Sequence, residues 1–235
     1  MTQSRRLGER TWTDLAEPEG RTLIIPVGSM EQHGPHLPLD TDARIAAAVA
    51  RRVAVDDPSI LLAPPVAYGA SGEHEGFPGT LSIGHDALRA VLVELGRSAG
   101  GWATRLLFVN GHGGNLPTVP EAAAQLRVEG RDVAWFGCTV PGGDAHAGHT
   151  ETSIMLALDA PLVREDAAEA GNTASLRELL PTLVRGGVAA ASPNGVLGDP
   201  YGASAAQGEM FLAGMVGQLR EKLSRWEPDE RGRLA

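Results

Sequence analysis

The chain has 235 residues, 43% of them hydrophobic, a formal net charge of -9 at pH 7 and one cysteine. This length can bury a sizeable core, and no linker or charge block divides it, so we expect a single domain over residues 1–235. The acidic balance gives no reason to expect nucleic acid or a membrane as a partner. With one cysteine, no signal segment and no run of about 18 apolar residues, the expected location is cytoplasmic.

The first elements of the chain are predicted from two apolar patterns. Thr22 to Val27 is a short β-prone run and predicts a buried strand. Asp42 to Val53 places Ile45, Val49 and Val53 at intervals of four residues, the spacing of a helix with one buried stripe. The segment from Ile24 to Asp42, which joins this strand to this helix, carries several ionisable side chains.

A second strand, an irregular loop and a second helix are predicted next. Ile60 to Val66 reads as a strand. Tyr68 to Gly79 contains four glycines and a proline in twelve residues, which predicts a functional loop. The helix that follows is marked by Leu88, Val91, Leu92 and Leu95.

The middle of the chain repeats the alternation of strand and helix. Arg105 to Val109 predicts a buried strand that ends at the glycine-rich turn Asn110 to Asn115. A helix over about Thr118 to Glu129 and a strand over Asp132 to Cys138 follow. Strands alternating with helices of this length predict an α/β fold with a mainly parallel sheet covered on both faces. Ligands of such sheets lie beyond the carboxyl ends of the strands.

The last third of the chain is less regular. Glu151 to Leu158 predicts a helix, and Gly186 to Ala203 is rich in Gly, Pro and Asn and predicts a loop. Glu209 to Trp226 predicts an amphipathic helix, whose apolar stripe is expected to pack in the core or against another subunit.

The first candidate site lies between the first strand and the first helix. Glu31 and His33 are two residues apart, so in an extended segment both side chains point to the same side. Asp42 follows a turn rich in Gly and Pro. Carboxylates and an imidazole together suit a divalent cation such as Zn, Fe or Mn. The alternative is structural: Asp42 caps the helix and His33 lies at the surface.

The second candidate is the turn Asn110-Gly-His-Gly-Gly-Asn115, with His112 at a strand end between glycines that allow close approach to a ligand. We favour a metal-binding or pocket histidine. A phosphate cradle is the alternative, but the turn lacks the Lys and Ser/Thr of a nucleotide-binding loop.

The third candidate runs from Asp144 to Glu151 and holds two histidines and two carboxylates. His146 precedes the predicted helix and suits a general base or acid near neutral pH. Glu151 falls in the first turn of that helix, where the dipole favours a carboxylate for structural reasons alone. His149 is expected to be exposed.

These motifs, VGSMEQHGPHLPLDTD, EHEGFPGTLSIG, VNGHGGN and HAGHTETS in this order and spacing, resemble the creatininase (creatinine amidohydrolase) family. The resemblance spans about Leu23 to Leu158 and is greatest to the creatininase-like peptidases of mycofactocin biosynthesis. It implies a three-layer α/β/α subunit in a homo-hexamer, with two divalent metal ions per subunit (Fe²⁺, Zn²⁺ or Mn²⁺) and amide hydrolysis as the reaction.

The resemblance also implies roles for individual residues. Glu31, Asp42 and His112 hold one metal, His33 and Asp42 hold the other, and Asp42 bridges the two. Creatininase supplies a further glutamate two residues after the strand-end histidine, where this chain has Gly114. Glu151 is the expected replacement, with a single-metal site or a water-filled position as alternatives.

The implied reaction is hydrolysis by a water whose pKa the metals lower, with His146 passing a proton to the departing nitrogen. The favoured substrate is the modified mycofactocin precursor peptide, from which a C-terminal Val-Tyr dipeptide is removed. Hydrolysis of creatinine or of a formamidopyrimidine is the alternative, although the tryptophans that cover creatinine in creatininase have no counterpart here. Tyr68, Glu73 and His74 are predicted to line the substrate pocket.

Two other classes of function remain open from the sequence. A thiol hydrolase would use Cys138 with His112 or His146, although a cysteine that ends an apolar strand is usually buried and inert. A metal-stabilised scaffold without enzymatic activity is the other alternative. The ligand types do not select one metal.

Overall fold

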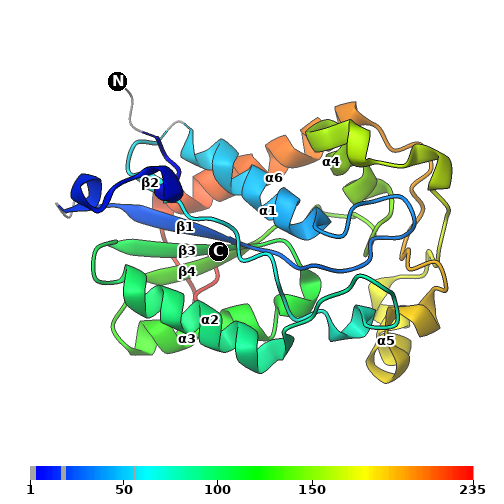
Figure 1. Ribbon diagram of the computed structural model, residues 1–235, viewed down its shortest axis with the longest axis horizontal. Coiled ribbons are helices and arrows are strands. Elements are labelled where there is room, and N and C mark those ends of the chain that lie inside the picture. The colour runs from blue at the N-terminus through cyan, green and yellow to red at the C-terminus, as the bar shows by residue number, and fades with distance from the viewer. Residues whose placement is uncertain (1–3, 17–19, 56, 235) are drawn as a thin grey trace.

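The computed structural model describes residues 4–16, 20–55 and 57–234. Its centre is a parallel sheet of four strands in the order β2-β1-β3-β4 (Figure 1). The strands are β1 (Thr22–Val27), β2 (Ile60–Leu62), β3 (Arg105–Asn110) and β4 (Val133–Gly137). The prediction of a mainly parallel sheet is therefore confirmed.

The second predicted strand is shorter than expected. Its ladder ends at Leu62, because the chain continues through Pro64 and Pro65, which have no N–H to donate. Val66 still pairs with Val27 through a single bridge. The predicted strand over Ile60 to Val66 is thus interrupted by its own prolines.

Helices cover both faces of the sheet and give the expected three layers (Figure 1). On one face lie α1 (Thr41–Ala54) and α6 (Ala205–Arg225), with α4 (His149–Asp159) packed against α6. On the other face lie α2 (Gly84–Ala99) and α3 (Thr118–Val128). The 3-10 turns are 7–9, 12–15, 72–74, 113–115, 160–162 and 165–167.

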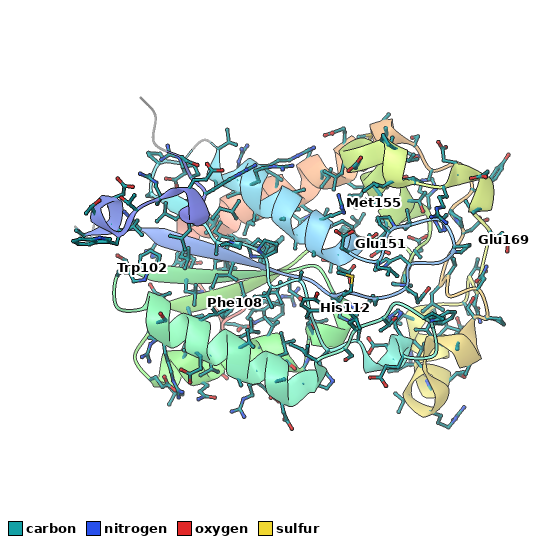
Figure 2. All side chains as sticks on the ribbon, viewed as in Figure 1. Trp102, Phe108, His112, Glu151, Met155 and Glu169 are labelled. Atoms are coloured by element: carbon teal, nitrogen blue, oxygen red, sulfur yellow. The ribbon has the colours of Figure 1, made fainter. Side chains whose placement is uncertain are left out.

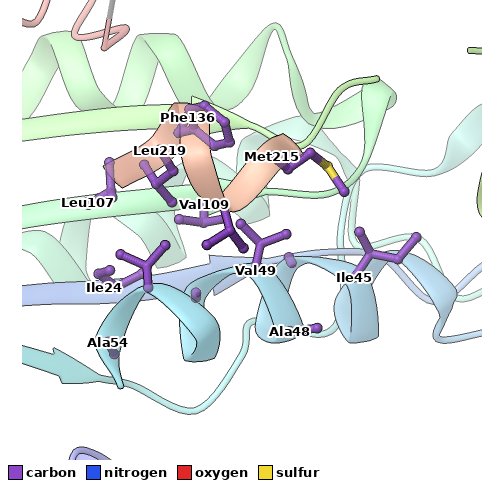
Figure 3. Close-up of a cluster of buried hydrophobic side chains, with 14 of the residues drawn as sticks. Ile24, Ile45, Ala48, Val49, Ala54, Leu107, Val109, Phe136, Met215 and Leu219 are labelled. Carbon is purple, nitrogen blue, oxygen red and sulfur yellow. The ribbon is translucent and has the colours of Figure 1, made fainter. Parts of the chain in front are cut away.

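Alternate strand residues supply the two halves of the core. Toward α1 and α6, Ile24 and Phe136 of the sheet meet Val49, Met215 and Leu219 (Figure 3). The opposite side chains of the same strands pack against α2 and α3: Leu23, Ile25, Leu106 and Phe108. Each fully buried large side chain contributes roughly 1.5–3 kcal/mol. Burial on both faces explains why the strands are apolar throughout rather than alternating.

A helix that the sequence did not predict, α5 (Leu176–Ala191), precedes the final loop. Ser175 caps it and forms a capping box with Glu178. Gly187 breaks the helical dihedrals with a φ of 69°. The loop predicted over Gly186 to Ala203 is therefore wrong for residues 186–191, where glycines inside a kinked helix resemble loop composition.

Short segments from distant parts of the chain pair with the two outer strands. The Leu62 N–H donates to Arg5 O at 2.8 Å, beside β2. Beside β4, the Trp135 N–H donates to Gly232 O at 2.8 Å, and the Leu234 N–H donates to Trp135 O at 3.0 Å. Among the described residues, no helix is both long and apolar enough to cross a membrane.

Candidate metal centre

The ionisable side chains singled out in the sequence meet at the carboxyl edge of the sheet, where the segments after β1, β3 and β4 converge. His112, after β3, and Glu151, in the first turn of α4, lie at this end of the molecule (Figure 2). The structure brings together every predicted site residue except Tyr68: Glu31, His33, Asp42, Glu73, His74, His112, His146 and Glu151.

Asp42 lies between two histidines of the centre and contacts both. It lies in the first turn of α1, with Oδ1 3.1 Å from His33 Nε2 and Oδ2 3.1 Å from His112 Nδ1. The Ser29 hydroxyl donates to Oδ2 at 2.6 Å. Burial opposes ionisation, but the neighbouring histidines hold the pKa of Asp42 well below its usual range. The alternative role as a helix cap is wrong, because the capping position is Asp40.

Glu31 is fully buried, and neither of its carboxylate oxygens accepts a hydrogen bond. Oε2 lies 3.1 Å from His112 Nε2, and Oε1 lies 3.2 Å from His74 Nε2. Burial raises the pKa of Glu31 to about 7, against the opposing effect of His112. A buried carboxylate without hydrogen-bond partners is costly unless a cation satisfies it.

His33 presents one nitrogen to the centre. The Nδ1–H donates to the carbonyl oxygen of Glu31 at 3.1 Å, so Nε2 faces Asp42 and, at 3.9 Å, Glu151 Oε2. A backbone partner on one ring nitrogen is the usual arrangement of a histidine that ligates a metal through the other. Burial lowers the pKa of His33, but the hydrogen bond and charge of Asp42, together with the charges of Glu151 and Glu31, raise the value to about 10.

Three overlapping groups of ligand atoms, each within 4.8 Å of one another, fit a divalent cation among the described residues. They are Glu31, Asp42 and His112; His33, Asp42 and Glu151; and Glu31, His33 and His146. Carboxylate and imidazole donors of this kind suit Zn, Fe or Mn. The donor set and the orphaned oxygens of Glu31 therefore fit a metal centre.

Glu151 lies next to His33 and Asp42, and its role as a metal ligand stays a prediction. Its Oε2 accepts the Ala147 N–H at 2.6 Å. Ala147 is buried with a φ of 52°, a left-handed conformation that costs about 1 kcal/mol or more and is typical of functional sites. Burial raises the pKa of Glu151 to about 7.

Gly114 has no room for a side chain. A Cβ there would lie 2.3 Å from Glu73 Oε1, 2.4 Å from His112 Nε2 and 2.7 Å from Ala70 O. The Glu73 carboxylate thus occupies the direction in which a residue 114 side chain would point, 3.3 Å from His112 Nε2. Burial acts to raise the pKa of Glu73, but the hydrogen bond and the charge of His112 together with smaller effects lower it.

His146 and His74 are both buried beside Glu31. His146 Nδ1 lies 3.8 Å from Glu31 Oε1 and 4.0 Å from Glu151 Oε2. Burial lowers the pKa of His74 to about 3 and the pKa of His146 well below its usual range, so both imidazoles are neutral. A neutral imidazole aimed at the centre is suited to accept and return a proton.

Tyr68 does not join the cluster. Its side chain is 46% exposed, at the start of the loop that continues to Ala70. Tyr68 as a substrate-binding residue stays a prediction. His149, which was expected to be exposed, is half-buried away from the centre, with Nε2 2.8 Å from Gln207 Oε1.

Sequence reasoning missed several buried residues that hold the centre together. Asn115 accepts the Ala70 N–H through Oδ1 at 2.9 Å and donates through Nδ2 to Gly28 O at 2.9 Å, which ties three segments to one another. Gln32 contacts both His74 and His146. The two-residue alternation that places Glu31 and His33 on the same side leaves out Gln32. Only the buried contacts of Gln32 in the structure reveal that it belongs to the centre.

Cys138 is unsuited to nucleophilic chemistry. Burial raises the pKa of its thiol to about 12, so the reactive thiolate is not formed near neutral pH. The raised pKa of the Cys138 thiol disfavours the thiol hydrolase considered from the sequence.

Comparison with known proteins agrees with the geometry. Residues 8–223 match the family model described as creatininase, creatinine amidohydrolase. A mycofactocin precursor peptide peptidase of Mycolicibacterium smegmatis is 57% identical over 217 residues, covering 90% of this chain and 88% of that protein. A creatinine amidohydrolase of Pseudomonas putida is 32% identical over 202 residues, covering 71% of this chain and 76% of that protein. A solved structure, "Creatininase Mn", is 25% identical with a TM-score of 0.76 and covers 96% of this chain and 100% of that one.

Proposed function

Because this chain belongs to the creatininase family, we propose that it is a metal-dependent peptidase that removes a C-terminal Val-Tyr dipeptide from the modified mycofactocin precursor peptide. It acts as a hydrolase of C–N bonds. The peptidase relative at 57% identity supports this substrate over creatinine, since the creatinine amidohydrolase relative is 32% identical.

One observation carries the proposal: the fully buried Glu31 carboxylate, with neither oxygen hydrogen-bonded, within overlapping groups of metal-ligand atoms. Burying a carboxylate without partners costs free energy of folding, and a bound cation would offset that cost. Two divalent ions per subunit, of Fe²⁺, Zn²⁺ or Mn²⁺, are the proposed cofactors. The related solved structure "Creatininase Mn" supports a metal of this class.

The ligand atoms divide between two positions. Glu31, Asp42 and His112 would hold one ion, and His33, Asp42 and Glu151 would hold the other, with Asp42 common to both groups. When bound, the ions activate a water and polarise the scissile carbonyl.

His146 moves the proton in this reaction. Its Nδ1 lies 3.8 Å from Glu31 Oε1 and 4.0 Å from Glu151 Oε2. The neutral imidazole accepts a proton there and delivers it to the departing nitrogen. Glu73 and His74 border the same space, and we propose that both contact the substrate.

The test of the metal assignment separates ligands from the proton carrier. Glu31→Gln and His112→Ala should lose bound metal and turnover together, because each removes a ligand. His146→Ala should keep its metal and lose about 10²–10⁴-fold in rate. Metal content by elemental analysis and turnover of the reconstituted protein are measured side by side.

His85→Ala is the matched control, because His85 is exposed on α2 and outside the cluster. It should retain both metal and turnover. A metal-free Glu31→Gln protein that remains fully active would contradict the assignment.

The substrate is tested by incubating metal-reconstituted protein with creatinine, a formamidopyrimidine and a modified peptide that ends in Val-Tyr, with mass spectrometry as the readout. We expect only the peptide to be shortened. Cleavage of creatinine alone would overturn the peptidase assignment. Chelation tests the scaffold alternative, because a scaffold would lose its fold and the enzyme chiefly its activity.

The family resemblance also suggests how the subunits assemble. We propose a homo-hexamer, which light scattering of the purified protein will test. Apolar residues on the exposed side of α5, Leu176, Leu180 and Val184, offer a surface for contact between subunits. The cytoplasmic location stays a prediction.

A further inference from the structure

Gln32 is a buried amide, 5% exposed, within the centre. Its Oε1 accepts the Gly34 N–H at 2.8 Å, which fixes the orientation of the amide. Its Nε2 therefore faces His74 Nδ1 at 2.9 Å, Gly195 O at 3.0 Å and His146 Nε2 at 3.0 Å. Three neighbours share an amino group that has only two protons.

A second contact of His146 shows which two of these three neighbours accept the amide protons. His146 Nε2 also lies 2.9 Å from the backbone oxygen of Gln32, which can only accept. His146 Nε2 must then carry a proton and donate it to that oxygen. It is no acceptor for the amide, so the two amide protons go to His74 Nδ1 and Gly195 O.

The two histidines are thereby set in opposite tautomers. His146 is protonated on Nε2 and bare on Nδ1, the nitrogen that faces Glu31 and Glu151. His74 is bare on Nδ1, where it accepts from Gln32, and protonated on Nε2, 3.2 Å from Glu31 Oε1. One ring offers a lone pair to the centre and the other offers a proton.

The neighbouring backbone is adapted to this arrangement. Gly195 has a φ of 80°, and a Cβ there would lie 2.0 Å from Gln32 Oε1. Position 195 therefore requires glycine for two reasons, and its carbonyl receives one amide proton. A surface glutamine would impose no such requirement on a residue 163 positions away.

We propose that Gln32 is a positioning residue that fixes His146 as the proton acceptor through Nδ1 and fixes His74 in the tautomer that carries its proton on Nε2. In this arrangement His74 Nε2 carries a proton and does not ligate a metal, while Glu31 Oε2 faces His112. The role of His146 in turnover rests on the proposed function, whereas the tautomers are a property of the folded protein.

The tautomers are measured directly by ¹⁵N NMR of histidine-labelled, zinc-loaded protein, since protonated and bare ring nitrogens have well-separated resonances. His74→Gln and His146→Gln variants assign the signals. We expect His74 with the proton on Nε2 and His146 with the proton on Nε2 and a bare Nδ1. A wild-type protein with a protonated His74 Nδ1 or a protonated His146 Nδ1 would overturn the proposal, whether or not any variant folds.

Gln32→Glu tests the cause. The carboxylate cannot donate to His74 Nδ1, so that nitrogen should become protonated, while His146 keeps its tautomer through the backbone oxygen. Because His74 loses its fixed tautomer and the metal ligands are kept, kcat should fall at least tenfold, with metal content within about twofold. Unchanged His74 signals and kcat would refute the role of Gln32.

Gln207→Glu is the matched control. Gln207 also contacts a histidine, but through Oε1, which the substitution keeps, and it lies outside the centre. It should alter neither kcat nor the signals of His74 and His146. If wild-type protein shows the expected tautomers and cleaves no peptide, the proposed function fails and the positioning by Gln32 stands.

Discussion

His36 is buried beside the centre without belonging to it, and it connects stability with pH at the scale of one residue. Its side chain is 1% exposed, and Nε2 lies 2.8 Å from Thr152 Oγ1. Burial, with a smaller contribution from the charge of His33, lowers the pKa of His36 to about 4. A histidine depressed in this way stays neutral in the folded protein and becomes protonated more readily on unfolding.

The stabilisation by neutral His36 is fully present above pH 6.5, the ordinary value, and is lost as the pH falls towards about 4. Relative to His36→Gln, the wild type should lose about 2 kcal/mol of unfolding free energy between pH 7 and pH 5. Urea denaturation of both chelated proteins gives this difference, and the other titrating groups cancel in it. A difference that is constant with pH would show that His36 titrates normally.

The kink in α5 tests how one element positions another. Gly187 has a φ of 69°, and a Cβ there would lie 2.6 Å from the carbonyl oxygen of Glu73, in the 3-10 turn Gly72–His74. Gly187→Ala should lower the free energy of unfolding by about 1–3 kcal/mol through backbone strain. It should also lower turnover, because it displaces the turn that carries Glu73 and His74.

Gly217→Ala is the control for Gly187→Ala. Gly217 lies inside α6 with open space around its Cα, so alanine there should stabilise the protein by about 0.5–1 kcal/mol. Urea denaturation and turnover are compared for the two variants. Equal effects would mean that the kink has no part in holding the turn.

The sequence predicted the elements wherever periodicity and buried composition agreed. The strands at Thr22–Val27 and Arg105–Asn110 are buried on both faces, and the helices at Thr41–Ala54 and Ala205–Arg225 carry one buried stripe. The helix Leu176–Ala191 escaped prediction because an internal proline and glycines hide its periodicity.

Site prediction depended on chemical type. Carboxylates and imidazoles that follow strand ends singled out Glu31, His33, Asp42 and His112, which lie together in the structure. The contacts of Gln32 with Gly195 join residues from opposite ends of the chain, and no local pattern reveals such a pairing.

At the scale of the whole molecule, metal binding is expected to stabilise the fold. The proposed ligands come from segments as far apart as Glu31 and Glu151, so the unfolded chain offers no comparable site. At a metal concentration 100 times Kd the folded state gains about 2.7 kcal/mol, which raises Tm by about 5–11 °C for a chain of this size. Calorimetry with and without metal measures the shift. Glu31→Gln should show little or none, and an equal shift in that variant would indicate binding elsewhere.

The outer strands of the sheet are already occupied by the chain itself, by the segment at Arg5 and Arg6 beside β2 and by the segment from Gly232 to Leu234 beside β4. Free strand edges recruit other chains and lead to aggregation. The backbone N–H groups nearest to these segments already donate to acceptors in the same chain. Pairing with the sheet of a second copy would therefore add few hydrogen bonds. A contact between copies is therefore expected to use helices and loops rather than the strand edges.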